Sequence, residues 1–262
     1  MFVITELGAG AVSRWRYVQN VAAVSWGVIS VAVKARHWPR TVRAVLAKQV
    51  IFTGVDALKL ILLVGFLAGI SIVAQVGVWV TRLGQSELLG SVLCAIVVRE
   101  IAPLLVNFIV IGRSGTAVAT ELAGMKVRNE INVLEAQGID PMIYLVMPRT
   151  IGMVLSVFCL GVFFVVISLG SGYLFGLLRG SESTDPGAFL RVVMTAVTPS
   201  DIANFLSKTL IPPLLTGVIC CLEGIGVRGL MTDVPQAATR GVVKSIIALI
   251  IVSAVVSLLT YA

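Results

Sequence analysis

The chain has 262 residues, of which 58% are hydrophobic and only 13% are charged. A soluble protein of ordinary composition carries about 25% charged residues, and the mean hydropathy of this chain is +1.02. These values exclude an ordinary soluble domain and predict a multi-pass membrane protein. The net charge of +7 therefore indicates basic segments on the cytoplasmic side of a membrane, and no binding of nucleic acid.

The N-terminal region, residues 1–49, mixes apolar and basic residues. Its apolar stretch, 18–33, is shorter than the roughly 20 residues that a spanning helix needs, and basic residues flank it on both sides. We therefore expect one or two helices lying in the membrane interface. A short membrane span is the alternative. The aromatic residues expected at headgroup depth are Trp15, Tyr17, Trp26 and Trp38.

Five longer apolar segments follow, and each can cross the hydrocarbon core of a membrane. They predict an all-α polytopic fold with spans at about 50–80, 88–111, 150–178, 202–225 and 241–261. The Lys and Arg residues concentrate in 1–49, 112–149 and 226–240, which predicts a cytoplasmic N-terminus and a C-terminus on the opposite side. In this count of basic residues, Lys208 is assigned to the side of the membrane opposite the cytoplasm. Glycines in the first and third spans allow close helix packing or bending: Gly65, Gly69, Gly161, Gly170, Gly172 and Gly176.

Arg99 and Glu100 are adjacent charged residues within the second span, and Pro103 follows them. Charged side chains in an apolar helix are costly and usually face a protein interior or a water-filled cavity. Adjacent residues on a helix do not face each other, so we expect each of the two to bind groups on other helices. A polar patch along a substrate path and a structural clamp between helices both fit this pattern.

Residues 112–149 form the longest hydrophilic stretch between two spans. Within it, apolar spacing predicts an amphipathic helix over about 115–136, which Gly138 ends before a turn at Asp140 and Pro141. Such a helix can dock into a groove on a soluble partner or rest on lipid headgroups. Because acidic and basic residues balance in this stretch, a protein partner is favoured.

The sequence contains no G-x-x-x-x-G-K-[ST] nucleotide-binding loop. His37 is its only histidine, which argues against a zinc site with paired histidines and against a Ser-His-Asp triad. We therefore expect no catalytic residues, no metal and no cofactor on this chain. Transport against a gradient would then draw its energy from a partner or from ions.

Several short motifs occur in the centre of the chain: R-E-I-A-P at 99–103, G-R-S-G at 112–115, E-L-A-G-M at 121–125, G-I-D-P at 138–141 and P-R at 148–149. Together with Gln75 and the run A-A-T-R-G-V-V at 237–243, they make the chain resemble the MlaE/YrbE permeases. These are the membrane subunits of lipid-transporting ABC systems associated with MCE proteins. The resemblance covers about residues 50–262, which defines an expected permease domain after the N-terminal region.

This resemblance implies a homodimer in the bacterial inner membrane, with two cytoplasmic ABC ATPase subunits that bind ATP and Mg. It also implies a periplasmic hexamer of an MCE-domain protein. The implied activity is movement of phospholipid between the inner membrane and the MCE channel, which maintains outer-membrane lipid asymmetry. Two alternatives are an ion-coupled secondary transporter of a hydrophobic substrate that uses Arg99 and Glu100, and an intramembrane lipid-modifying enzyme.

The resemblance also implies two groups of site residues. The first group is expected to line a lipid cavity: Ile72, Gln75, Trp79, Leu83, Arg99 and Glu100. The second group is expected to form a cytoplasmic coupling helix that contacts the ATPase: Met125, Arg128, Glu130, Leu134, Glu135 and Gly138.

Overall fold

The computed structural model describes residues 2–34, 38–83, 92, 94–178 and 186–261. Within these ranges, the side chains of residues 2–14, 77–83, 94, 186, 188–190 and 192 lie outside the description. The regular elements of this part of the chain are all helical. The α-helices are α1 (Phe2–Val33), α2 (Arg40–Val50), α3 (Asp56–Leu83), α5 (Ala102–Val110), α6 (Thr116–Val127), α7 (Glu130–Ala136), α8 (Met147–Leu178), α9 (Pro186–Ala196), α10 (Pro199–Ile225) and α11 (Asp233–Tyr261). Wider π-helical turns adjoin several of them: η2 (Ile51–Val55), η4 (Cys94–Ile101), η5 (Ile111–Gly115) and η6 (Met142–Val146).

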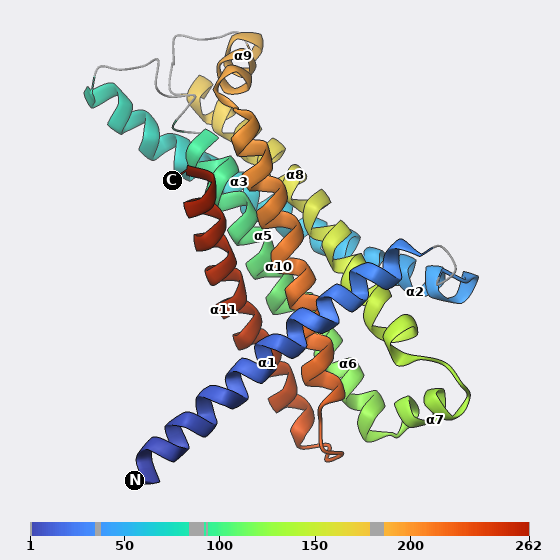
Figure 1. Cartoon of the computed structure of the whole chain (residues 1–262). Helices are drawn as coiled ribbons and strands as arrows, with labels where there is room; N and C mark the ends of the chain where they lie inside the picture. Colours follow the sequence, from blue (N-terminus) through green and yellow to red (C-terminus); the bar gives the residue numbers. More distant parts are fainter. Residues whose placement is uncertain (1, 35–37, 84–91, 93, 179–185, 262) are drawn as a thin grey trace.

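Within these described ranges, five helical stretches are long and apolar enough to cross a membrane. They are Arg40–Val76, Ala95–Val127, Met142–Leu178, Pro199–Ile225 and Asp233–Tyr261, which confirms the predicted all-α fold with about five spans. Figure 1 shows them as a bundle, with α9 and the C-terminus at one end and α7 at the other. We call these two ends of the bundle the α9 end and the α7 end.

The N-terminal residues form one long helix, α1, which runs obliquely across the bundle (Figure 1). Val21 and Val28 on α1 are buried in the main hydrophobic core, whereas Trp15 and Trp26 are 65% and 73% exposed. This division of apolar and amphipathic side chains suits a helix that packs on the bundle with one face and meets headgroups with the other. Trp38, just before α2, donates its Nε1–H to the Ala32 carbonyl at 2.7 Å and so fastens the end of α1.

The polar stretch that we expected to begin at residue 112 begins later. The second span continues through η5 and α6 as far as Val127, and Ser114 and Leu122 are fully buried. The expected helix over 115–136 is also divided, because Asn129 adopts a left-handed conformation (φ 59°) between α6 and α7. The prediction was wrong here because G-R-S-G has the composition of a loop, whereas its last two residues, Ser114 and Gly115, are buried in the helix bundle. A side-chain carbon added to Gly115 would lie 3.2 Å from Cys220 Sγ of α10.

Close packing of α3 against α8 depends on glycine. A Cβ atom added to Gly69 would lie 2.0 Å from the carbonyl oxygen of Ser168, and one added to Gly172 would lie 2.4 Å from a methyl carbon of Val73. Such contacts let the backbones of two membrane helices approach closely. The packing role expected for the glycines of the first and third spans is thus confirmed at Gly65, Gly69, Gly161 and Gly172, whereas Gly170 and Gly176 have no heavy atom within 4 Å of an added Cβ.

Candidate functional site

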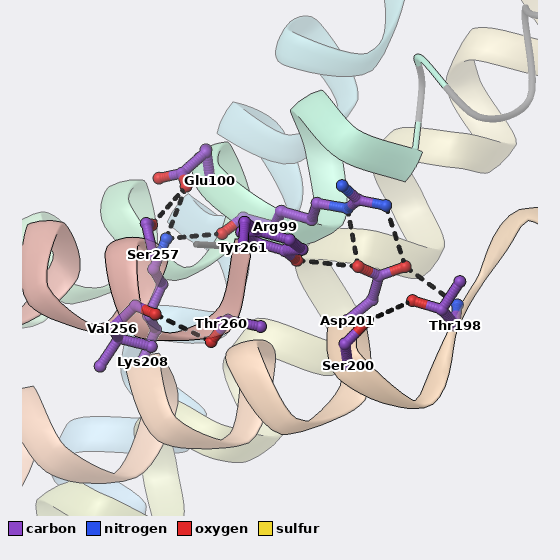
Figure 2. Close-up of polar contacts among 10 residues, drawn as sticks. All are labelled: Arg99, Glu100, Thr198, Ser200, Asp201, Lys208, Val256, Ser257, Thr260 and Tyr261. Carbon is purple, nitrogen blue, oxygen red and sulfur yellow. Dashed lines mark hydrogen bonds and ion pairs between the residues drawn. The ribbon is translucent and has the colours of Figure 1, made fainter.

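The side chain of Arg99, on the π-helical turn η4, binds a carboxylate on another span. Arg99 Nε lies 2.7 Å from Asp201 Oδ1, and Arg99 Nη2 donates to Asp201 Oδ2 at 3.2 Å. Tyr261 of α11 donates its hydroxyl to Asp201 Oδ1 at 2.8 Å, and its ring centre lies 4.7 Å from Arg99 Cζ. Figure 2 shows the three side chains converging on one point, at the start of α10. The guanidinium therefore contacts both oxygens of the carboxylate, one of them through a charge-assisted hydrogen bond.

Asp201 is positioned by the start of its own helix. Thr198 is the N-cap of α10, and the Thr198 backbone N–H donates to Asp201 Oδ2 at 2.9 Å as one half of a capping box. Pro199 follows at the first helical position, where its fixed φ and missing N–H are favourable. The Asp201 side chain is 0% exposed. One buried carboxylate therefore caps α10 and also joins it to η4 and α11.

Glu100, the next residue of η4, pairs with a different charge. Lys208 of α10 donates its Nζ to Glu100 Oε1 at 2.7 Å and to the Arg99 carbonyl at 3.0 Å. Ser257 of α11 donates to the same Glu100 oxygen at 2.8 Å (Figure 2). Lys208 is therefore no outside-loop residue, as we had counted it; it lies within the fourth span and its side chain is 1% exposed. The predicted fourth span, 202–225, already contained Lys208, so counting this lysine with the outside residues was wrong.

The expectation that Arg99 and Glu100 bind groups on other helices is confirmed. The two positive and two negative charges balance. Each ion pair joins one buried side chain to one that is partly exposed. The partners on α10, Asp201 and Lys208, are 0% and 1% exposed, whereas Arg99 and Glu100 keep 27% and 44% of their side-chain surface open. One guanidinium and one carboxylate are thus presented at the edge of the bundle and supported from behind by buried partners.

The remaining cavity candidates lie on α3. Ile72 is half-buried and packs in a small cluster with Val76 and with Ile96 of η4, so it lies near the charged residues. Gln75 is exposed on the same helix. The side chains of Trp79 and Leu83 lie outside the described part of the chain, so their place relative to Arg99 stays a prediction.

Sequence reasoning missed four members of this site: Asp201, Lys208, Ser257 and Tyr261. The Thr198–Asp201 spacing is that of a capping box, and Lys208 is a charged residue in an apolar span. Asp201 and Lys208 could therefore have been identified from the sequence. Ser257 and Tyr261 carried none, because their role depends on how α11 packs against η4.

The coupling candidates lie at the α7 end. Arg128 and Glu130 form an ion pair across the turn at Asn129. The hydrogen bond that Arg128 donates to the Glu130 carboxylate raises the pKa of the guanidinium further above its ordinary value. Gly138, with φ +75°, ends the α7 segment in a conformation that favours glycine. Met125 and Leu134 are partly buried against the core, whereas Glu135 and Gly138 are exposed.

A second charged cluster ties α1, α10 and α11 together near this end. Glu223 of α10 binds Lys244 at 2.7 Å and Arg240 at 3.2 Å, both on α11. The Lys244 ammonium lies 3.8 Å from the centre of the Tyr17 ring on α1. Burial, followed by the nearby charge of Glu223, raises the pKa of the Tyr17 hydroxyl, which therefore stays protonated. This cluster fixes α1 to the last span.

Comparisons with known proteins agree with this architecture. A family model described as Permease MlaE matches residues 46–259. A probable ABC transporter permease protein of Rickettsia prowazekii is 27% identical over 237 residues, which cover 87% of this chain and 89% of the relative. The intermembrane phospholipid transport system permease protein MlaE of Haemophilus influenzae is 27% identical over 244 residues, covering 92% and 91%.

A plant protein is similar over a comparable length. The chloroplastic protein TRIGALACTOSYLDIACYLGLYCEROL 1 of Arabidopsis thaliana is 28% identical over 250 residues, which are 93% of this chain and 67% of the plant protein. The family match includes all five candidate spans almost entirely, the α7 connection, and every residue of the charged site except Tyr261. This chain belongs to the MlaE permease family and is an ABC transporter permease subunit that is not itself catalytic.

Proposed function

We propose that this permease moves phospholipid between the bacterial inner membrane and a periplasmic MCE-protein channel, and that it thereby helps to maintain outer-membrane lipid asymmetry. The observation that carries the proposal is the pair Arg99 and Glu100, which is partly open at the edge of an otherwise apolar bundle. The relative from Haemophilus influenzae, named as an intermembrane phospholipid transport permease, supports the same substrate class.

The charges at this site suit a lipid headgroup. Ionised groups exposed within a membrane-spanning segment are costly unless they meet water or a polar partner. The Arg99 guanidinium has donors suited to a phosphate, and the Glu100 carboxylate can accept from an amine or hydroxyl of the headgroup. The apolar surface of α3, including Ile72, would then meet the acyl chains.

The proposed assembly is a homodimer with two ATPase subunits, which hold the ATP and Mg, and with an MCE-domain hexamer on the other side. The α7 end faces the cytoplasm, as the distribution of basic residues indicates, and the C-terminus lies on the periplasmic side. The residues that contact the ATPase are Met125, Arg128, Glu130, Leu134, Glu135 and Gly138.

One helical stretch gives a physical route between ATPase and lipid. Residues Ala95–Val127 form a continuous span, with Arg99 and Glu100 near one end and Met125 near the other. Closure of the ATPases against the α7 connection would therefore tilt or shift the same helix that presents the charged site. In the dimer, such movements would compress the cavity between the two copies and drive the lipid out.

Native purification of the tagged full chain in mild detergent, with mass spectrometry of proteins and lipids, tests this proposal. We expect an ABC ATPase, an MCE-domain protein and bound phospholipid to purify with the chain. Recovery of the chain without any ATPase would contradict the proposed assembly and would favour an ion-coupled mechanism.

A further inference from the structure

A second group of charged residues lies within the spans, away from the Arg99–Glu100 site. Arg113, on η5, lies 3.5 Å from Asp56 of α3 through its Nη2, and Arg113 Nη1 donates to the Phe52 carbonyl of η2 at 2.8 Å. The Phe52 ring centre lies 5.0 Å from Arg113 Cζ. Lys59 is exposed and lies three residues after Asp56, hence on the same face of α3.

The position of Arg113 is fixed, yet its charge is incompletely matched. The Phe52 carbonyl and ring hold the guanidinium on one side, while the contact with Asp56 is longer than a good charge-assisted hydrogen bond. The side chains of Arg113 and Asp56 remain 32% and 51% exposed. A partly exposed arginine and an exposed lysine with one carboxylate leave a local excess of positive charge inside an apolar span, which calls for an anionic partner.

We propose that Arg113 and Lys59 form a second binding station for a lipid phosphate. Arg113 lies about four helical turns from Arg99 along the same stretch, and thus between the charged site and the α7 end. A headgroup that moves between the leaflet at the α7 end and the Arg99–Glu100 site would meet this station on its way. Asp56 competes with the phosphate for Arg113, which keeps the binding reversible.

This inference rests on the proposed function for its biological role, although lipid binding can be measured without transport. The complex containing the full-length chain is placed in micelles doped with phosphatidylglycerol, and the lipid retained per chain is counted by native mass spectrometry. Arg113→Gln and Lys59→Gln should each lower the apparent affinity about fivefold, the factor expected when one basic residue is removed from an anionic surface. Asp56→Asn should raise the affinity, because it frees the guanidinium.

Arg191→Gln is the matched control, because it removes one exposed basic residue from α9 at the other end of the bundle. Equal retention by all four variants and the wild type would overturn the inference. Should Arg113→Gln fail to fold, the opposite effects of Lys59→Gln and Asp56→Asn on lipid affinity still test the inference. The hydrogen bond to the Phe52 carbonyl comes from Arg113 and is kept in both variants. Displacement of the lipid by excess inorganic phosphate would indicate a site for a free anion and would contradict a lipid occupant.

Two further outcomes separate this station from the proposed transport function. Loss of the dimer in Arg113→Gln, with unchanged lipid retention in the other variants, would assign Arg113 to a contact between two copies and overturn the inference. Phospholipid transfer that depends on Glu100 but not on Arg113, Lys59 or Asp56, together with unchanged retention, would overturn the second station while leaving the transport function intact.

Discussion

Lys208 and Glu100 form a 2.7 Å ion pair in which the lysine side chain is 1% exposed and the glutamate side chain is 44% exposed. The lysine also donates to the Arg99 carbonyl, and Ser257 donates to Glu100. The buried lysine therefore holds the open carboxylate in place from behind. This arrangement suits a group that must face a substrate yet keep one orientation.

The first prediction concerns the coupling of this pair. Lys208→Met should destabilise the protein, because Glu100 would lose its counter-charge while remaining next to apolar helices. Glu100→Gln should cost less, and the double variant should recover part of the loss. A double-mutant cycle on detergent-solubilised protein should give a coupling of about 1 kcal/mol, toward the lower part of the range for contacting residues because Glu100 is exposed. Additive effects of the two changes would contradict the pairing.

The second prediction compares how much stability is lost when the Asp201 carboxylate is removed and when only its hydrogen bond from Tyr261 is removed. Asp201→Ala should be strongly destabilising, by about 3–5 kcal/mol, because it removes the buried partner of Arg99 together with the cap of α10. Tyr261→Phe should cost only about 1 kcal/mol, because it removes one hydrogen bond and keeps the ring beneath Arg99. Chemical unfolding in detergent measures both values, and an equal loss for the two variants would be inconsistent with the geometry of the cluster.

The third prediction compares two glycines on one helix pair. Gly69→Ala should destabilise the protein, because its methyl group would lie 2.0 Å from the Ser168 carbonyl and would force α3 and α8 apart. Gly170→Ala is the matched control, since a Cβ there meets no heavy atom within 4 Å, and it should be neutral or slightly stabilising. Thermal unfolding of the two variants should separate them, and equal stability would argue against close packing of α3 on α8.

Composition and periodicity were sufficient to predict the five spans, because a membrane demands long apolar helices whatever their packing. They also predicted that Arg99 and Glu100 would bind other helices, because unpaired charges are costly there. Two features were beyond the sequence. The burial of Ser114 and Gly115 depends on how closely α10 approaches Gly115, and the roles of Ser257 and Tyr261 depend on the tertiary position of α11.

The fourth prediction concerns the α7 connection. Glu135→Lys should weaken co-purification of the ATPase, because Glu135 is exposed at the end proposed to contact that partner. Arg191→Glu, a charge reversal on α9 at the opposite end, is the control and should leave co-purification unchanged. Insertion and folding should be normal in both variants, which size-exclusion chromatography checks. Undiminished ATPase recovery with Glu135→Lys would place the contact elsewhere.

The most direct test of the proposed function is ATP-dependent transfer of a labelled phospholipid by the reconstituted complex. Glu100→Gln is compared with Glu182→Gln, which makes the same chemical change in a polar connecting segment. We predict that Glu100→Gln slows transfer about tenfold or more while ATPase subunits remain bound, and that Glu182→Gln transfers at the wild-type rate. Wild-type transfer by Glu100→Gln would contradict a substrate role for the Arg99–Glu100 site and leave it as a clamp between helices.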